Sequence, residues 1–144
     1  MKKYIIALAL VLTAMVSMAQ EFKEVDLRSS TNTTVTDTVT NAAVKLLVTP
    51  STPQFYNTVG VGVVVTKISG TSAGVVRLMG SLDGINYFRV NPTDSLNVGN
   101  VTPGQPKAFI VTSYAYKYLG VQYTGSGTMA AKITAKALYK RGKQ

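Results

Sequence analysis

Asp83 and Asp94 are the only acidic residues in the middle of the chain, and they are the first candidates for chemistry. Most glycosidases use a pair of carboxylates for catalysis. Together with Asn86 and Asn97, the two aspartates would also offer oxygen ligands to calcium. However, Asp83 precedes Gly84 in a dipeptide typical of turns, and the D-x-D spacing of a calcium loop is absent. We therefore interpret Asp83–Gly84 as a turn and Asp94 as a loop cap.

The other residues that usually perform catalysis are scarce. The sequence has no His and no Cys, and it has only six acidic residues. Proton exchange near neutral pH, thiolate chemistry and metal binding all depend on these side chains. Serine is present, but no S-x-x-K motif accompanies it. The sequence thus predicts a protein that is not an enzyme, with no cofactor and no metal site.

Tyr114, Tyr116 and Tyr118 form the most distinctive aromatic pattern. They alternate with Ala115 and Lys117, which would place three rings on one side of a strand. Such a row would stack on sugar rings or unpaired bases, with Lys117 meeting an anionic group. The alternative is that the row packs in a core or a subunit interface, since aromatic residues are favoured in strands. Under both interpretations the three tyrosines and Lys117 are ligand or interface candidates.

Basic residues dominate the end of the chain. The formal net charge is +9, and no acid follows Asp94. An acidic neighbour in an assembly, a polysaccharide or a lipid surface would complement this charge, whereas no Arg-rich groove supports nucleic acid. The candidates for contact with an anionic partner are Lys132, Lys136, Lys140, Arg141 and Lys143.

The first nineteen residues differ from the rest. Lys2 and Lys3 precede an apolar run, and small residues end the segment at Ala19. This order is typical of a secretory signal peptide, and the run is too short to span a bilayer comfortably. We expect a signal-like helix over 1–19, one domain over 20–138 and a basic tail over 139–144. A membrane contact is expected only through the first segment, if it is not cleaved after Ala19.

The rest of the sequence is typical of β structure. Val and Thr are abundant, and Gly and Pro interrupt the chain at short intervals. We predict an all-β sandwich or jelly-roll-like fold with eight or nine short antiparallel strands. The clearest expected strands cover 22–27, 31–40 (an edge strand), 44–48, 59–68 (a central strand), 75–81, 85–90 and 116–123.

Three turn signals predict hairpins. The segments Ser69–Gly74 and Thr124–Thr128 are rich in Gly and Ser, and Asp83–Gly84 suits a tight turn with positive φ. The looser segment Asn91–Lys107 either crosses between sheets or forms an exposed loop. Residues 129–140 fit a strand with Ala131, Ile133, Ala135, Ala137 and Tyr139 inward, although the lysines also have helical spacing. The preceding Gly-Ser-Gly turn favours the strand.

Two segments carry a resemblance. Val75–Tyr87 contains G-S-L-D-G-I-N-Y, and Tyr116–Val121 with Thr124–Thr128 reads Y-K-Y-L-G-V and T-G-S-G-T. These motifs resemble small β-sandwich virion proteins of tailed phages, such as head decoration, fibre or tail parts. They are less closely similar to discoidin-type carbohydrate-binding sandwiches, with Tyr87 in place of a Trp and Gly120 in place of an Arg.

The resemblance and the composition together lead to two functional expectations. The first is a structural protein of a virion that acts through contacts with copies of itself or with other structural proteins. The second is an exported bacterial protein, located in the periplasm, at the cell surface or outside the cell, that binds a glycan or a partner protein. The start of the chain resembles those of exported Bacteroidetes proteins. Either the bacterial host exports the protein, or a virion protein uses this segment for membrane-linked assembly or packing. The virion protein is the leading expectation.

Overall fold

The computed structural model describes residues 22–29, 34–51, 56–112 and 115–141. These residues form eleven β-strands and no helix. The strands are β1 (Phe22–Asp26), β2 (Arg28–Ser29), β3 (Thr36–Thr40), β4 (Val44–Val48), β5 (Tyr56–Gly70), β6 (Gly74–Ser81), β7 (Phe88–Arg89), β8 (Ser95–Val98), β9 (Gln105–Thr112), β10 (Tyr118–Gly125) and β11 (Met129–Arg141). The expected signal-like helix and Lys143 lie outside the described residues.

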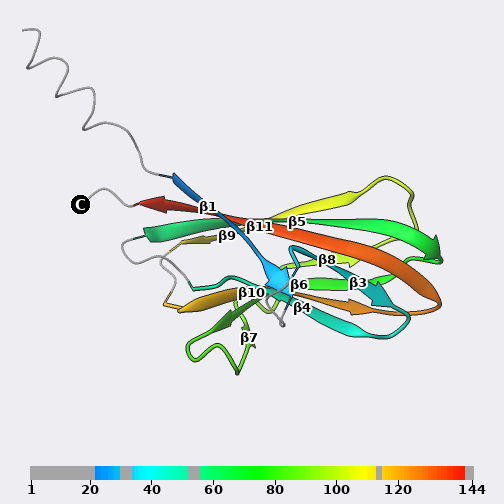
Figure 1. The fold of residues 1–144 in the computed structure, drawn as a ribbon, viewed down its shortest axis with the longest axis horizontal. Coiled ribbons are helices and arrows are strands. Elements are labelled where there is room, and N and C mark those ends of the chain that lie inside the picture. Colours follow the sequence, from blue (N-terminus) through cyan, green and yellow to red (C-terminus); the bar gives the residue numbers. More distant parts are fainter. Residues whose placement is uncertain (1–21, 30–33, 52–55, 113–114, 142–144) are drawn as a thin grey trace, which may run out of the picture.

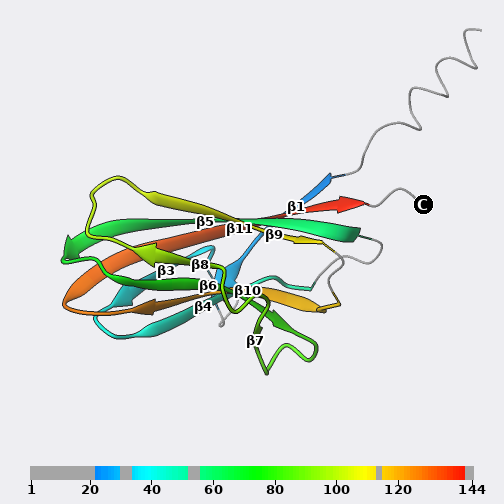
Figure 2. The same ribbon diagram turned by 180° about the vertical axis from the view of Figure 1, so that it is seen from behind.

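The strands form two antiparallel sheets that pack face to face, as the two layers in Figure 1 and the reverse view in Figure 2 show. Sheet A has the order β1-β11-β5-β9, with β3 also paired to β11. Sheet B has the order β2-β4-β10-β6-β7, with β8 also paired to β6. An all-β protein of two antiparallel sheets was expected, and the structure confirms it. Among the described residues, no helical segment has the length and apolar character needed to span a bilayer.

The core follows from the alternation of side chains along the two longest strands. In β5, Val59, Val61, Val63 and Val65 are buried, and the residues between them face solvent or are half-buried. The inward face of β11 is equally apolar and comprises Ala131, Ile133, Ala135, Ala137 and Tyr139. A period of two is the signature of a strand with one buried face. The strand predicted for the end of the chain is therefore confirmed, and the helical alternative is wrong.

The predicted number of short strands is wrong. The described residues hold eleven strands instead of eight or nine, and β5 and β11 have 15 and 13 residues. The long strands arise because their apolar alternation continues without a breaker: Gly60 and Gly62 in β5 both lie on the outer face, where no packing is lost. In contrast, the expected strand over 85–90 shrinks to the two residues of β7.

Two of the predicted hairpins are crossings between the sheets. The turn Ser69–Gly74 leads from β5 in sheet A to β6 in sheet B, and Thr124–Thr128 leads from β10 in sheet B to β11 in sheet A. The two turns support each other, since the Thr71 N–H donates to the Thr128 carbonyl oxygen over 3.0 Å. Because all four strands carry a continuous apolar face, stacking buries more apolar surface than direct pairing would. The segment Asn91–Lys107 also crosses between the sheets, through β8.

Candidate functional site

The tyrosine row is divided between the two faces of sheet B. Strand β10 begins only at Tyr118, so the alternation expected for 114–118 does not hold at Tyr116. Tyr116 packs against the core, and its ring occupies the space where a side chain on Gly80 would lie. Tyr118 precedes the buried Leu119 and therefore lies on the outer face. Tyr114 lies outside the described residues.

The loop between β6 and β7 is organised by the carboxylate of Asp83. Its Oδ1 accepts hydrogen bonds from the Ser81 hydroxyl (2.9 Å) and from the backbone N–H groups of Ile85 and Asn86 (both 2.8 Å). Its Oδ2 accepts one from the Asn86 side-chain amide (2.7 Å). The Ser81 Oγ in turn accepts the Gly84 N–H over 2.9 Å, and Gly84 has a φ of 81°. This network fixes residues 81–86 as one compact turn.

The loop places a second tyrosine beside Tyr118. The ring of Tyr87 lies over Gly120 of β10, so that a Cβ there would be 3.4 Å from Tyr87 Cε1. The ring of Tyr118 lies against Gly84, where a Cβ would be 3.1 Å from Cε2. The Tyr118 ring thus leaves little room for a side chain on Gly84, whereas the Tyr87 ring lies at ordinary contact distance from the position of a Cβ on Gly120.

The two rings border a hollow of about 270 Å³ on the outer face of sheet B. We call this the tyrosine hollow. Its lining comprises Val48, Thr49, Pro50, Asp83, Gly84, Tyr87 and Tyr118. Thr49 is held in place because its hydroxyl bonds to both the N–H and the carbonyl oxygen of Leu119. The Lys117 ammonium lies 5.6 Å from the centre of the Tyr118 ring, within cation–π range.

Tyr87 was named from the sequence only as the residue in place of the discoidin Trp, and not as a candidate site residue. The G-S-L-D-G-I-N-Y motif contained it, but the motif alone does not say that the loop folds back over β10. The pKa of Tyr87 is raised above its usual value. The main cause is the partial burial of the phenol, and the nearby Tyr118 and Asp83 contribute further. The phenol is therefore neutral at physiological pH and serves as a hydrogen-bond donor and a stacking face.

Among the described residues that line the tyrosine hollow, Asp83 is the one carboxylate. The backbone hydrogen bond from Asn86, followed by those from Ile85 and the side chains, holds the pKa of Asp83 far below its usual range. Asp94 lines a different hollow and lies 2.7 Å from the Lys107 ammonium. The pair of carboxylates that a glycosidase would need therefore does not share a site.

Metal ligands do not gather in the described part of the chain. Within it, no group of three or more His, Cys, Asp or Glu residues is close enough to hold an ion. Asn86, considered above as a calcium ligand, instead donates to Asp83. Asn97 lies in β8, opposite Val75 of β6.

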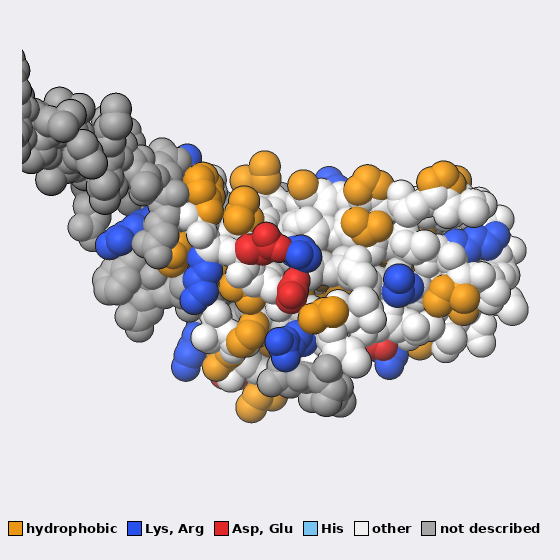
Figure 3. Space-filling model, turned by 45° about the horizontal axis from the view of Figure 1, so that its top comes forward, with side chains coloured by type: hydrophobic (Ala, Val, Ile, Leu, Met, Phe, Trp, Pro, Cys, Tyr) orange, Lys and Arg blue, Asp and Glu red, His pale blue; other side chains and the backbone are white. Residues whose placement is uncertain are grey.

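The basic residues of β11 face away from the core. Lys132, Lys136 and Lys140 lie on the outer face of sheet A, and Arg141 at the end of the strand is exposed. Lys136 forms an ion pair with Glu24 and approaches Asp26 to 3.6 Å, and the Glu24 pairing raises its pKa. Figure 3 shows separate basic side chains among apolar ones on the face it presents, not one continuous basic surface.

Comparison with known proteins identifies the fold but no family. No protein-family profile matches the chain, and no curated protein matches it. Among solved structures, the chain is similar to the K3 cleaved adhesin domain of Lys-gingipain from Porphyromonas gingivalis W83, with 12% identity and a TM-score of 0.52 over 68% of this chain. The matched region spans 64% of that adhesin chain.

Two further structures are similar at the same level. The K1 cleaved adhesin domain of Lys-gingipain matches with 9% identity and a TM-score of 0.50, over 85% of this chain and 99% of that domain. A chain of the T13 viral particle of IBDV matches with 11% identity and a TM-score of 0.51, over 85% of this chain and 31% of the viral chain. At these identities the likeness establishes a shared β-sandwich fold.

Proposed function

We propose that this chain is a non-catalytic recognition domain that binds a saccharide in the tyrosine hollow. The observation that carries the proposal is the pair of rings, Tyr87 and Tyr118, which pack against Gly120 and Gly84 beside a hydrogen-bonded turn. Rings that are already fixed lose little conformational entropy when a ligand binds. The fold shared with adhesin domains supports a surface role.

The chemistry of the hollow fits a sugar. The apolar C–H face of a pyranose stacks on an aromatic ring, and its hydroxyls need fixed hydrogen-bond partners. Asp83 Oδ1 already accepts three hydrogen bonds, but Oδ2 accepts one, which leaves capacity for a sugar hydroxyl. Since the pKa of Asp83 is depressed, this acceptor stays ionised under physiological conditions. We expect Oδ2 to orient the sugar that the rings hold.

The test is a glycan array followed by titration calorimetry of the saccharides that bind. Tyr87→Ala and Tyr118→Ala should each weaken binding about tenfold, as the loss of a stacked aromatic contact of about 1–3 kcal/mol implies. Phe88→Ala is the matched control, because Phe88 is 64% exposed in the neighbouring strand and does not line the hollow. If both tyrosine variants bind the saccharide with unchanged affinity, the proposal is wrong.

The same samples test the absence of catalysis. Bound saccharides incubated with the protein should be recovered intact, because Asp83 is committed to the turn and Asp94 pairs with Lys107. A hydrolytic rate that Asp83→Asn or Asp94→Asn abolishes would contradict a purely binding role.

A second candidate function is that of a structural component of a virion, as the phage-like motifs imply. Exposed apolar side chains on the outer face of sheet A favour it: Ile110 is 74% exposed, Phe22 53% and Leu138 46%. Such side chains are typical of surfaces that contact other proteins. Electron microscopy of purified particles would support this candidate if the protein is present in stoichiometric copies on a capsid or tail.

The two candidates also differ in where the protein resides. For the saccharide-binding candidate we propose export, with removal of residues 1–19. N-terminal sequencing of the protein from its native source should then give a first residue at Gln20. An intact Met1 would favour the virion candidate instead.

A further inference from the structure

Strand β9 ends sheet A with an edge that is unpaired in the described residues. It pairs with β5 on one side, from Gln105 opposite Val65 to Thr112 opposite Thr58. Pro106 lies opposite Val64 and has no N–H to donate to β5. This pair is therefore a non-hydrogen-bonded pair. Hydrogen-bonded and non-hydrogen-bonded pairs alternate along an antiparallel ladder, so the residues two and four positions after Pro106 also form non-hydrogen-bonded pairs with β5. The N–H and C=O groups of Ala108 and Ile110 consequently point away from β5.

Beyond Pro106, this edge lacks the features that normally prevent strands from pairing between molecules. Natural edge strands are protected by outward charges, by bulges or by proline along the edge. Here the register of β9 with β5 has no bulge, and the outer-face positions after Pro106 hold Ala108, Ile110 and Thr112. Ile110 is 74% exposed, which is the second-highest value among the large apolar side chains that the structure describes.

Local charge does not oppose approach by a second copy. Although the chain has a formal net charge of +9, the one charged residue of β9 is Lys107, and its ammonium pairs with Asp94 at 2.7 Å. The same ammonium lies 5.5 Å from the centre of the Phe109 ring. The edge is therefore close to neutral, and repulsion between two such edges is small.

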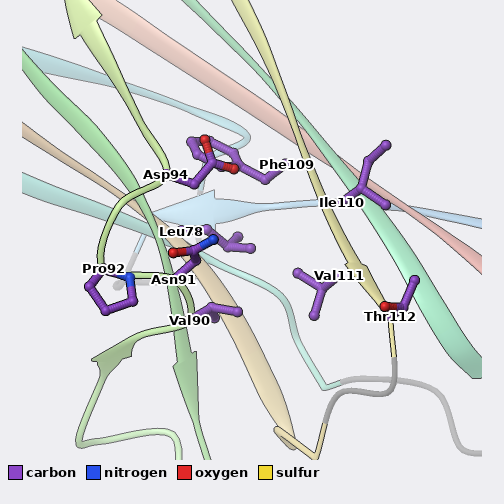
Figure 4. Close-up of a pocket in the computed structure, with 9 residues that line it drawn as sticks. All are labelled: Leu78, Val90, Asn91, Pro92, Asp94, Phe109, Ile110, Val111 and Thr112. Atoms are coloured by element: carbon purple, nitrogen blue, oxygen red, sulfur yellow. The ribbon is translucent and has the colours of Figure 1, made fainter.

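Beside the edge lies a hollow of about 280 Å³ between β9 and the segment that follows β7. Figure 4 shows Val111 from β9, Leu78 from β6 and Val90, which directly follows β7, around the same space. An added strand places alternate side chains on the core side of the sheet, and this hollow has room for them. The edge thus offers both free backbone groups and a place for side chains.

We propose that β9 pairs antiparallel with β9 of a second copy, about a two-fold axis near Phe109, so that the two sheets A become one continuous sheet. This axis pairs Ala108 of one copy with Ile110 of the other. Both residues have outward-pointing backbone groups, so four N–H···O=C bonds form around the axis. The small Ala108 side chain lies opposite the large, exposed Ile110 on the outer face, which makes the edge complementary to itself.

Sedimentation analysis of the full chain over a range of concentrations tests the interface. Ala108→Pro removes an N–H that the monomer does not use, and Ile110→Lys adds a charge at the edge. Each should raise the dimer dissociation constant at least about tenfold while circular dichroism shows an intact fold. Leu138→Lys is the matched control, since Leu138 shares the face and the row of Ile110 but lies on β11, two strands from the edge. It should leave the dimer unchanged.

Cross-linking tests the register. The chain has no cysteine, so introduced thiols are the only ones present. Residues paired across a hydrogen-bonded position lie about 5.5 Å apart at Cα, within disulfide range. A mixture of Ala108→Cys and Ile110→Cys chains should therefore cross-link faster under mild oxidation than either variant alone. Each of three results would overturn the proposal. The protein could be monomeric at all concentrations, the dimer could persist in both edge variants, or Leu138→Lys could weaken the dimer as much as the edge variants do.

Discussion

A methyl group on Gly80 tests where the ring of Tyr116 lies, and hence how the tyrosine row is divided. A Cβ on Gly80 would lie 2.5 Å from both Cγ and Cδ1 of Tyr116 and 2.7 Å from Cδ2. These distances are far below a normal carbon–carbon contact of about 3.5–4.0 Å. The Gly80→Ala variant therefore forces the ring away from the position in which it packs against the core.

The expected cost combines two opposing effects. Inserting a methyl group into a well-packed site costs about 1–3 kcal/mol. Replacing Gly by Ala in a strand raises the free energy of unfolding by about 0.5–1 kcal/mol, because the unfolded chain loses conformational freedom. Gly80→Ala should therefore lower the free energy of unfolding by about 1–2 kcal/mol. In a Tyr116→Ala background the clash is absent, and the same substitution should raise the free energy of unfolding by about 0.5 kcal/mol.

Urea unfolding of the four proteins in this double-mutant cycle measures the effect. The sign of the Gly80→Ala change should reverse between the two backgrounds, with a coupling energy of about 1.5–2.5 kcal/mol between the two sites. If Gly80→Ala has the same cost with and without the Tyr116 ring, then the ring does not lie over Gly80. The division of the row between the two faces of sheet B would then be refuted.

Three further predictions concern the turns and the surface. Asp83 has a lowered pKa in the folded state. Its contribution to stability is therefore complete above the unfolded-state pKa of about 3.9 and is lost as the pH falls further. The difference in urea midpoint between wild type and Asp83→Asn should accordingly shrink below about pH 4. Gly70→Ala should lower the free energy of unfolding by about 1–3 kcal/mol, because φ is 69° and the new Cβ would lie 2.3 Å from the Thr128 oxygen. Gly62→Ala is the control: no neighbour lies within 4 Å of its new Cβ, so it should raise the free energy of unfolding by about 0.5 kcal/mol. Lys136→Met should leave the melting temperature unchanged within error, since its ion pairs with Glu24 and Asp26 are exposed; a clear fall would show that they stabilise the sheet.

The fold was predictable where one face of a strand is buried along its whole length. The alternation from Ala131 to Tyr139 identified both the strand and its inward face, because burial imposes a period of two on the sequence. The partners of the strands were not predictable. Gly-Ser turns such as Thr124–Thr128 occur both in hairpins and in crossings between sheets, and only the packing of the flanking strands distinguishes the two.

The site was predictable only in part. Tyr118 and Asp83 were singled out, but in separate contexts, as a member of a row and as a turn residue. Their proximity depends on the loop that folds back over β10, and on Gly84, which leaves room for the Tyr118 ring. Contacts of this kind join residues more than thirty positions apart, so neither spacing nor composition reports them. For the same reason Tyr87 entered the sequence analysis only through the resemblance to discoidin-type sandwiches and not as a site candidate.

The most direct test of the saccharide-binding proposal is an NMR titration of the protein with the saccharide that it binds most tightly. The aromatic resonances of Tyr87 and Tyr118 should shift and saturate together, and the sugar C–H protons should show nuclear Overhauser contacts to both rings. The resonances of Tyr56 and Tyr139, which pack edge to face on each other with ring centres 6.0 Å apart, should stay unchanged. Saturable binding that leaves the Tyr87 and Tyr118 resonances unmoved would contradict the proposal.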